Sequence, residues 1–562
     1  MAEHFSEDRY SDMLNALFQR FPSFQKVGAG AYKPGIGNME FIDQLLGHPH
    51  RNYKVIHVAG TNGKGSVSNM LTSSLASLGF KVGLYTSPHI LDFRERMRVV
   101  EPAGAVGEVS FRLIAKEEVW DFVNAYKDTF DHLDMSFFEI TTIMALDWFS
   151  RQGVDYVVLE TGLGGRLDST NIVKPVLSVI TNIGLDHCDL LGDTLPEIAF
   201  EKAGIIKPCV PVVVGESHPE TDAVFERKVL YTNLPEPMFM GSRKMIEALL
   251  TFADRTEPML WDRHEAILAE MDLQGAYQHK NLRTALTALS VLASAEPQVA
   301  AAIHGAGVSG SGLASASGAV SDVGPGLGSV SVSVSGAGSG SGLGLVSGSG
   351  PGSGAGLGLV SGADVVYEAI VSTALLTGFR GRWDKVSDNP VVICDIGHNA
   401  HGLKYNFAHL ARMKAEGRCS ELIIVYGSVA DKDLDSVLPL MPLDAKYIFT
   451  QAKGKRALSA DVISEKFSAA YPSIETYKAS DVKEAVQLAL EMAAVSGSGV
   501  ASVAGAGASS VAGSGASATS SVCSSAASDS GVAADNADAG PLIYIGGSTY
   551  VVSEAVEFMS GK

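Results

Sequence analysis

The stretch YKVIHVAGTNGKGS (Tyr53–Ser66) decides the fold, because an apolar run passes directly into a glycine-rich turn that carries Lys64. The run Tyr53–Val58 is typical of a buried strand, and SVSNMLTSSLASLG, which begins at Ser66, has a helical pattern. Glycines let backbone N–H groups approach phosphate oxygens, and the N-terminus of a helix adds partial positive charge. This order predicts a phosphate-binding loop, although a glycine between Lys64 and Ser66 departs from the common GxxxxGK[ST] spacing. A tight strand-to-helix turn without a ligand is the alternative.

Outward from this loop, strand-like and helical runs alternate in two intervals. The first interval contains KVGLYTSP, VDYVVLETG and PVLSVITNIG, and the second contains NPVVICDIGHN, ELIIVYGSV, AKYIFTQA and PLIYIGGS. Their continuous apolar character indicates parallel strands that are covered on both faces. We therefore predict the α/β class, with a mainly parallel sheet in a larger domain (residues 1–304) and a smaller α/β domain (residues 363–562).

Two segments interrupt this pattern, and they account for much of the total of 60 glycines. Residues 305–362 and 496–540 consist almost wholly of small residues, with very few charges. Such segments offer too little side-chain volume to offset the entropy of ordering, so we expect flexible linkers that leave the domains intact. The run VSVSVSG alternates like a strand, which leaves local β-structure as the alternative.

Composition excludes several classes of protein. A net charge of −19 argues against a general nucleic-acid binder, and five scattered cysteines without a CxxC pair argue against disulfide frameworks and structural zinc. The acidic N-terminus lacks the features of a secretory signal, and no run of about 18 apolar residues predicts a membrane span. We expect a cytoplasmic monomer that acts on small molecules.

Further motifs follow the loop in a fixed order. They are YTSPHI (Tyr85–Ile90), FRERMRV (Phe93–Val99), ETGLGGRLDSTN (Glu160–Asn171), ITNIGLDH (Ile180–His187), EKAGIIKP (Glu201–Pro208), YQHKNLRTAL (Tyr277–Leu286), GRW (Gly381–Trp383), DIGHNAHG (Asp395–Gly402) and DKD (Asp431–Asp433). In order and spacing the chain resembles the Mur-ligase superfamily, and within it the bifunctional dihydrofolate synthase/folylpolyglutamate synthase family. Ala400 departs from the family's D-x-A-H-N-P form, which has proline there, and we expect this substitution to relax the loop.

The resemblance implies a P-loop-type Mur-ligase central domain and a smaller Rossmann-like C-terminal domain. It also implies ATP-dependent joining of L-glutamate to dihydropteroate and to the glutamyl tail of reduced folates, through an acyl phosphate. The alternatives are tail extension alone, a murein-precursor ligase, or a non-catalytic nucleotide-binding scaffold. TSPHI, FRERMRV and GLGGRLDSTN argue against the murein ligase, and retention of Lys64, Glu160, His187 and Lys202 argues against the scaffold.

The resemblance also implies roles for individual residues. Lys64, Lys202 and His398 would be catalytic, and Lys202 can become a magnesium-binding carbamate. Two Mg²⁺ ions would be held by Ser87, Glu160 and His187. The nucleotide would be held by Thr61, Asn62, Gly63, Lys64, Gly65, Ser66, Asn281, Arg382 and Asp395. Glu160 also has independent support, because it ends a predicted parallel strand, where such sheets bind ligands.

The resemblance also implies which residues contact the folate substrate. The contacting residues would be Ser136, Phe137, Phe138, Glu139, Leu167, Asp168 and Ser169. Phe138 would stack on the pterin ring. Arg94 and Arg96 would attract the carboxylates of a glutamyl tail.

The residues alone leave plainer alternatives open. Ser87, which precedes Pro88, can be a hydroxyl in a turn, and Lys202 can be a surface lysine on a helix. His187 can be a structural histidine, and His398 a loop histidine. Phe137 and Phe138 read as core residues at a helix start, and we expect this to hold for one of them. Loop arginines such as Arg94 and Arg96 are commonly solvated.

Overall fold

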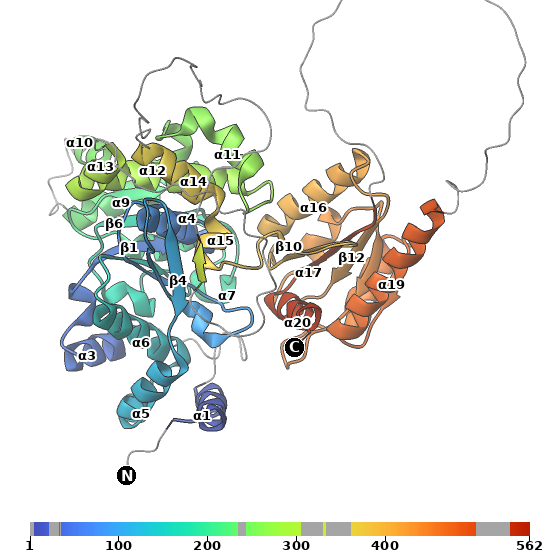
Figure 1. Cartoon of the computed structure of the whole chain (residues 1–562), viewed down its shortest axis with the longest axis horizontal. Helices are drawn as coiled ribbons and strands as arrows, with labels where there is room; N and C mark the ends of the chain where they lie inside the picture. Colours follow the sequence, from blue (N-terminus) through green and yellow to red (C-terminus); the bar gives the residue numbers. More distant parts are fainter. Residues whose placement is uncertain are drawn as a thin grey trace, which may run out of the picture. The chain divides into compact units, whose positions relative to one another are not determined.

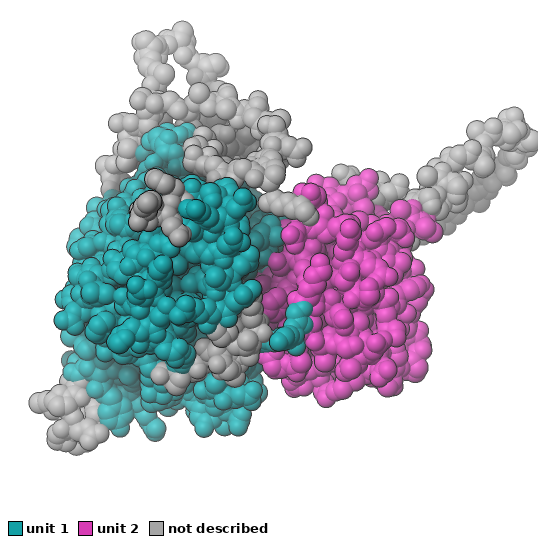
Figure 2. Space-filling view, turned by 90° about the horizontal axis from the view of Figure 1, so that it is seen from below, with its two compact units in different colours: residues 1–384, 399–405, 454–456 teal, residues 385–398, 406–453, 457–562 magenta. Residues whose placement is uncertain are grey.

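The structure is a computed structural model that describes residues 5–21, 33, 35–233, 243–304, 330–332, 361–501 and 540–561, with only the backbone at 330–332 and 496–501. It divides into two compact units, which Figure 2 distinguishes by colour. Unit 1 comprises Met1–Asp384, Asn399–Tyr405 and Gly454–Arg456. Unit 2 comprises Lys385–His398, Asn406–Lys453 and Ala457–Lys562.

Unit 1 is built on one sheet with the strand order β8-β7-β6-β1-β5-β2-β3-β4-β9. The strands are β1 (Lys54–Ala59), β2 (Val82–Tyr85), β3 (Met97–Pro102), β4 (Val109–Leu113), β5 (Tyr156–Glu160), β6 (Leu177–Ile180), β7 (Val212–Val214), β8 (Leu250–Phe252) and β9 (Val330–Val332). The pairings from β8 to β2 are parallel, and those from β2 to β9 are antiparallel. β1 therefore lies between β5 and β6, with its carboxyl end at the same edge as theirs.

Helices cover both faces of this sheet (Figure 1). One face packs its alternate residues, such as Val58 and Val158, against α4 (Lys64–Ser77), α11 (His264–Glu270), α12 (Gln278–Ala295), α13 (Pro297–His304), α14 (Gly362–Val371) and α15 (Thr373–Thr377). The other face packs Val55, Val157 and Leu159 against α1 (Glu7–Arg20), α3 (Gly37–Leu45), α5 (Lys116–His132) and α6 (Phe137–Gln152). The edge around β7 is covered by α8 (Leu195–Lys202), α9 (Asp222–Asn233) and α10 (Arg243–Leu249), and α7 (Cys188–Leu191) precedes α8. Burial of both faces explains the continuous apolar strands.

Local sequence signals set several of these helix ends. The Ser136 side chain accepts from the Glu139 N–H while the Glu139 carboxylate accepts from the Ser136 N–H, which is a capping box at the start of α6. Gly153 ends α6 with φ +61°. Thr194 and Glu197 form the same reciprocal pair at the start of α8. The caps of α6 and α8 therefore hold Phe138 and Lys202 on fixed elements.

Unit 2 contains a six-stranded sheet with the order β10-β11-β15-β12-β13-β14. Its strands are β10 (Asp384–Asp388), β11 (Val391–Asp395), β12 (Leu422–Tyr426), β13 (Lys446–Phe449), β14 (Thr476–Lys478) and β15 (Leu542–Gly546). Pairings from β11 to β14 are parallel. Its helices are α16 (Ala400–Ala415), α17 (Leu434–Val437), α18 (Ala460–Ala470), α19 (Val482–Ala501) and α20 (Thr549–Met559). Figure 1 shows α16 on one side of this sheet, and α19 and α20 on the other.

The predicted α/β class with two sheets is confirmed. The predicted domain limits stay a prediction, but α14 and α15, which follow the first low-complexity segment, cluster with unit 1. Asp272 explains this placement, because its carboxylate accepts from the N–H groups of Ala374 and Leu375. Within 305–362, Val330–Val332 pairs with β4 as β9, and α14 begins at Gly362. Residues 496–501, at the start of the second segment, belong to α19. The predicted flexibility of 305–329, 333–360 and 502–539 lies outside the described residues.

No single helix in the described part of the chain combines the length and apolar composition of a membrane span. The bent pair of α12 and α13, whose axes meet at 115°, meets those two criteria together. Leu282, Leu289 and Val299 of this pair are buried in the core beside α4.

The packing of the hydrophobic core in unit 1 can be tested by comparing a buried leucine with an exposed one. Leu146 of α6 is fully buried, whereas the side chain of Leu375 is 54% exposed. We expect Leu146→Ala to lower the free energy of unfolding by about 2–5 kcal/mol, since it leaves a cavity, and Leu375→Ala to change it by less than about 0.5 kcal/mol. Urea unfolding followed by tryptophan fluorescence measures this, because Trp120, Trp148, Trp261 and Trp383 all belong to unit 1. Equal losses in the two variants would contradict the described packing.

Candidate active site

The loop between β1 and α4 requires glycine at two positions, and a third glycine at the start of α4 is closely packed. A Cβ atom on Gly60 would lie 1.8 Å from Thr181 Oγ1, and one on Gly63 would lie 2.3 Å from Asn281 Oδ1. Both residues also have positive φ, +151° and +83°. A Cβ on Gly65 would meet the Phe379 ring at 3.0 Å and Arg382 Nη2 at 3.5 Å. The loop is therefore enclosed by Asn281 and Arg382, and the structure brings these two predicted nucleotide contacts to it.

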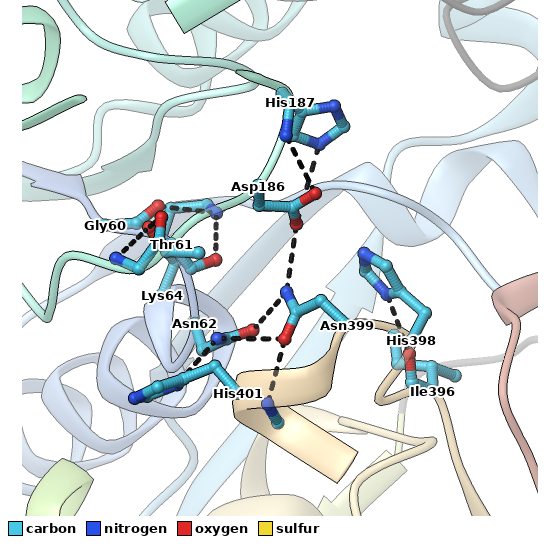
Figure 3. Close-up of polar contacts among 12 residues, drawn as sticks. Gly60, Thr61, Asn62, Lys64, Asp186, His187, Ile396, His398, Asn399 and His401 are labelled. Carbon is cyan, nitrogen blue, oxygen red and sulfur yellow. Dashed lines mark hydrogen bonds and ion pairs between the residues drawn. The ribbon is translucent and has the colours of Figure 1, made fainter. Parts of the chain in front are cut away.

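Two lysines converge on one carbonyl group of this loop. Lys64 Nζ donates to the Gly60 oxygen at 3.0 Å and to the Thr61 oxygen at 3.3 Å, and Lys202 Nζ donates to the same Gly60 oxygen at 2.9 Å (Figure 3 shows Lys64). Lys202 is buried, so its reading as a surface lysine is wrong. Burial, and then the charge of Lys64, lowers the pKa of Lys202 to about 7. Lys202 is consequently a partly neutral amine at neutral pH.

Glu160 lies at the carboxyl end of β5, beside the loop, and is buried. Its carboxylate accepts from the Ser87 N–H, but Oε2 has no hydrogen-bond partner. Burial raises the pKa of Glu160 to about 7, although Lys64 and Arg382 oppose this rise. A buried carboxylate oxygen without a partner is costly unless a proton or a cation satisfies it. Glu160 with the adjacent Ser87 thus has the chemistry of a hard-cation site.

His187 lies in the loop after β6 with φ +54°. Its N–H donates to Asp186 Oδ1 at 2.9 Å, and its Nε2 atom lies 3.9 Å from Asp186 Oδ2. No group of three or more His, Cys, Asp or Glu side chains forms a metal-type cluster within the described ranges. The predicted set of Ser87, Glu160 and His187 holds only two side chains of those types, so it stays a prediction.

Asp395 and His398 lie in unit 2, in the loop that follows β11. Asp395 is buried, and its Oδ1 atom accepts from the Gly397 N–H and from Asn406 Nδ2, both at 2.7 Å. The ring Nδ1 atom of His398 hydrogen-bonds to the Ile396 oxygen at 3.0 Å. Their predicted roles toward the nucleotide and the phosphate stay predictions.

The two phenylalanines at the start of α6 differ in burial and in the residues that they contact. Phe137 is buried and stacks on Phe18 with ring centroids 5.0 Å apart, whereas Phe138 is only partly buried. The Phe138 ring lies against Gly162, where a Cβ would meet it at 2.4 Å. Phe137 is thus the core residue, and Phe138 remains the candidate for stacking.

The other predicted folate contacts also have structural partners. Ser136 and Glu139 form the capping box of α6. Asp168 is buried and accepts from the Leu163 N–H and from the N–H and hydroxyl of Thr170, while Leu167 is half-buried and Ser169 is buried. Asp168 therefore organises its own loop, which includes the 3₁₀ helix Ser169–Ile172.

Arg94 and Arg96 are buried rather than solvated. Arg94 forms an ion pair with Asp92 at 2.9 Å. Arg96 Nε donates to His89 at 2.8 Å, and its guanidinium lies 5.5 Å from the centroid of the Phe137 ring. Both arginines therefore position the motif FRERMRV, and their attraction for a glutamyl tail stays a prediction.

Sequence reasoning missed two polar arrangements. His57 is fully buried on β1, where Nε2 hydrogen-bonds to Thr170 Oγ1 at 2.8 Å, and burial lowers the pKa of His57 to about 3. The second arrangement joins Asn62 of the loop to Asn399 and His401 (Figure 3). No periodicity or spacing reveals a contact between residues 337 positions apart.

The raised pKa of Glu160 gives a prediction for stability. Between pH 4.5 and about 7 the folded chain keeps a proton on Glu160 that the unfolded chain loses, so the free energy of unfolding falls as the pH rises through this window. Glu160→Gln removes this loss, and without metal ions the variant should be more stable than the native chain at pH 8, by on the order of 3 kcal/mol. Urea unfolding in EDTA at several pH values measures the difference. A difference that does not depend on pH would contradict the raised pKa.

Comparisons with known proteins match two regions of the chain to Mur ligases. The model of the Mur ligase middle domain matches residues 58–289, and the model of the Mur ligase glutamate ligase domain matches residues 381–507. A dihydrofolate synthase/folylpolyglutamate synthase of Bacillus subtilis is 37% identical over 274 residues, which are 47% of this chain and 59% of that protein. The chain thus spans less than two thirds of that relative.

Other matches extend over more of the chain. The protein of the same name from Haemophilus influenzae is 28% identical over 480 residues, which cover 82% of this chain and 90% of that protein. The structure of a bifunctional folylpolyglutamate synthase/dihydrofolate synthase of Yersinia pestis, complexed with AMPPNP and Mn ion, superposes with a TM-score of 0.59. Its sequence is 20% identical over 98% of both chains, so this likeness concerns the fold. With both Mur ligase models matched in order, the chain belongs to the folylpolyglutamate synthase/dihydrofolate synthase family of Mur ligases.

Proposed function

We propose that the chain is an ATP-dependent ligase that joins L-glutamate to dihydropteroate and to the glutamyl tail of reduced folates. The observation that supports this most is the convergence of Lys64 and Lys202 on the Gly60 carbonyl, beside the buried carboxylate of Glu160. This arrangement combines cations for phosphates with an acidic group for a divalent metal. The names of the relatives support the choice of folate as the acceptor.

The proposed reaction has two steps. A carboxylate oxygen of the acceptor attacks the γ-phosphorus of ATP, so that an acyl phosphate forms and ADP leaves. The amino group of glutamate then attacks the acyl carbon, and the tetrahedral intermediate collapses to an amide and inorganic phosphate, with loss of a proton. Lys64 and the loop N–H groups neutralise charge on the phosphoryl group in flight, while Asn281 and Arg382 enclose the nucleotide. Asp395 and His398 would complete the nucleotide and phosphate contacts.

Glu160 and Ser87 are the residues that would hold the first Mg²⁺ ion, and His187 the second. The unpartnered Oε2 atom of Glu160 fits this role, because a cation beside it would favour the charged carboxylate. Bound magnesium would neutralise phosphate charge. Lys202 fits carboxylation, because its neutral amine can take up CO₂ and the resulting carbamate would face the Lys64 ammonium as an opposite charge.

The acceptor choice is tested with ATP, Mg²⁺, glutamate and either dihydropteroate or tetrahydrofolate. Product formation with both acceptors would support the proposal that the chain has both synthase activities. Product from tetrahydrofolate alone would restrict the chain to tail extension. No product from either, with a sample that binds ATP, would overturn the proposed function.

We further propose that the chain acts as a monomer in the cytoplasm. The five cysteines are scattered along the sequence and form no CxxC pair, which suits a reducing compartment. Size-exclusion chromatography with light scattering measures the oligomeric state, and a stable dimer would contradict this part of the proposal.

Lys64 is predicted to be essential for turnover. Lys64→Ala should lower kcat by about 10³-fold or more, because a preorganised cation at the transferring phosphoryl group is lost. Lys54→Ala is the matched control, since Lys54 begins β1, the strand before the loop, but pairs with Glu296. Circular dichroism checks that both variants fold. Turnover by Lys64→Ala at the rate of the control would contradict the role of Lys64.

Substitutions of Phe137 and Phe138 should have different effects, one on stability and the other on substrate binding. Phe138→Ala should raise the KM for dihydropteroate about ten-fold, through loss of ring stacking, and leave the KM for ATP unchanged. Phe137→Ala should instead lower the free energy of unfolding by about 3–5 kcal/mol, because its ring is buried in the core. Steady-state kinetics and urea unfolding distinguish the two effects. The reverse assignment of effects would contradict the proposed stacking on Phe138.

A further inference from the structure

Asn62, in the middle of the phosphate loop, is held on all its polar groups. Its N–H donates to Asn182 Oδ1 at 2.9 Å, and its carbonyl accepts from the Thr181 hydroxyl. Its side chain forms a reciprocal amide pair with Asn399, in which the two N···O distances are 3.3 and 3.1 Å. The Asn62 Nδ2 atom also donates to His401 Nδ1 at 3.1 Å. Figure 3 shows this side-chain cluster.

Asn399 is itself fixed by two further contacts. Its Nδ2 atom donates to Asp186 Oδ2 at 2.9 Å, and its Oδ1 atom accepts from the Gly402 N–H at 2.8 Å. The amide pair therefore determines which way the Asn62 side chain points. If the Asn62 amide were flipped, its NH₂ group would face the NH₂ group of Asn399, and its oxygen would face the Asn399 oxygen. In this orientation the Asn62 NH₂ group must meet an acceptor, and His401 Nδ1 supplies it.

The same segment, Asn399–Tyr405, also reaches the backbone side of Asn62. Lys280 Nζ donates to the Tyr405 hydroxyl at 2.9 Å and to the Glu216 carboxylate, and Glu216 accepts from Asn182 Nδ2 at 3.2 Å. The His401 and Tyr405 rings lie 5.8 Å apart. Contacts thus run from Asn62 through His401, Tyr405, Lys280, Glu216 and Asn182 back to Asn62. All these residues belong to unit 1.

We propose that His401 and Asn399 are positioning residues that fix Asn62, and through it hold the phosphate loop in the shape that binds ATP. This inference rests on the proposed function, since the loop must bind ATP. Neither residue needs to touch the substrate. Their contribution is to reduce the conformations that the loop can adopt before ATP binds, which improves affinity without a new contact.

The role of His401 depends on its neutral form. Only an unprotonated Nδ1 atom can accept from Asn62, whereas imidazolium would oppose one donor with another. Burial lowers the pKa of His401, and the nearby Lys280 and Lys404 act in the same direction, whereas Glu216 opposes them. Tyr405 also faces the ring, and Asp186 is reached through Asn399. Acidification below pH 6.5 should therefore loosen the loop.

The experiment measures binding of β,γ-methylene-ATP with Mg²⁺ by titration calorimetry on the full chain, at about pH 8 and at about pH 5.5. His401→Leu removes the acceptor and should weaken binding at pH 8 by about five- to ten-fold. His401→Asn places Oδ1 where Nδ1 lies, so it should bind like the native chain at pH 8 and lose less affinity at pH 5.5 than the native chain does. His409→Leu is the matched control on α16, because His409 is a partly buried histidine outside the ring of contacts, and it should bind like the native chain.

The outcomes separate this inference from the proposed function. Native-like binding by His401→Leu at pH 8, or an equal loss in His401→Asn and His401→Leu, would overturn the positioning role alone. Absence of analogue binding by the native chain would overturn the proposed function and this inference together. Circular dichroism and thermal melting check folding. Should His401→Leu not fold, the pH profile of His401→Asn decides, because an acid loss as large as that of the native chain would overturn the proposal.

Discussion

Two lysine side chains donate to one carbonyl oxygen in this protein, and the site is organised around that contact. Lys64 and Lys202 both donate to Gly60, although the two charges repel and Lys202 is buried. Burial, and then the charge of Lys64, lowers the pKa of Lys202 to about 7, and two positive charges at this distance are unfavourable unless negative charge lies nearby. The phosphates of ATP, the carboxylate of Glu160 and a carbamate on Lys202 would each supply that charge. The fold therefore holds excess positive charge where a polyanionic substrate is proposed to bind.

The sheet explains why these groups meet. β1 lies between β5 and β6, so the carboxyl ends of three parallel strands deliver Gly60, Glu160 and Thr181 to one edge. Close approach is then enforced by glycine, since a Cβ on Gly60 or Gly63 would collide with Thr181 or Asn281. Asn62, between these glycines, is held by hydrogen bonds to both its backbone and its side chain. The loop combines glycines that permit its conformation with partners that restrict it.

Much of this could be predicted from the sequence, and the exceptions have physical reasons. Continuous apolar strands such as VDYVVLE predict a parallel sheet, and Glu160 at a strand end predicts its place in the crevice. The roles of Ser87, Lys202 and Asn281 came only from family resemblance, because a serine, a lysine or an asparagine in those contexts is usually structural. Periodicity cannot distinguish Phe137 from Phe138, since both stand at the first turn of a helix. The contact of Asn62 with His401 spans 339 positions and depends on tertiary structure alone.

In the proposed function, ATP drives ligation through an acyl phosphate on the acceptor carboxylate. The most direct measurement uses dihydropteroate labelled with ¹⁸O in both carboxylate oxygens and follows the label into inorganic phosphate by mass spectrometry. If an acyl phosphate forms, one ¹⁸O atom enters phosphate for each amide bond formed, because the bridging oxygen leaves with the phosphoryl group. Amide formation that releases only unlabelled phosphate would exclude this intermediate.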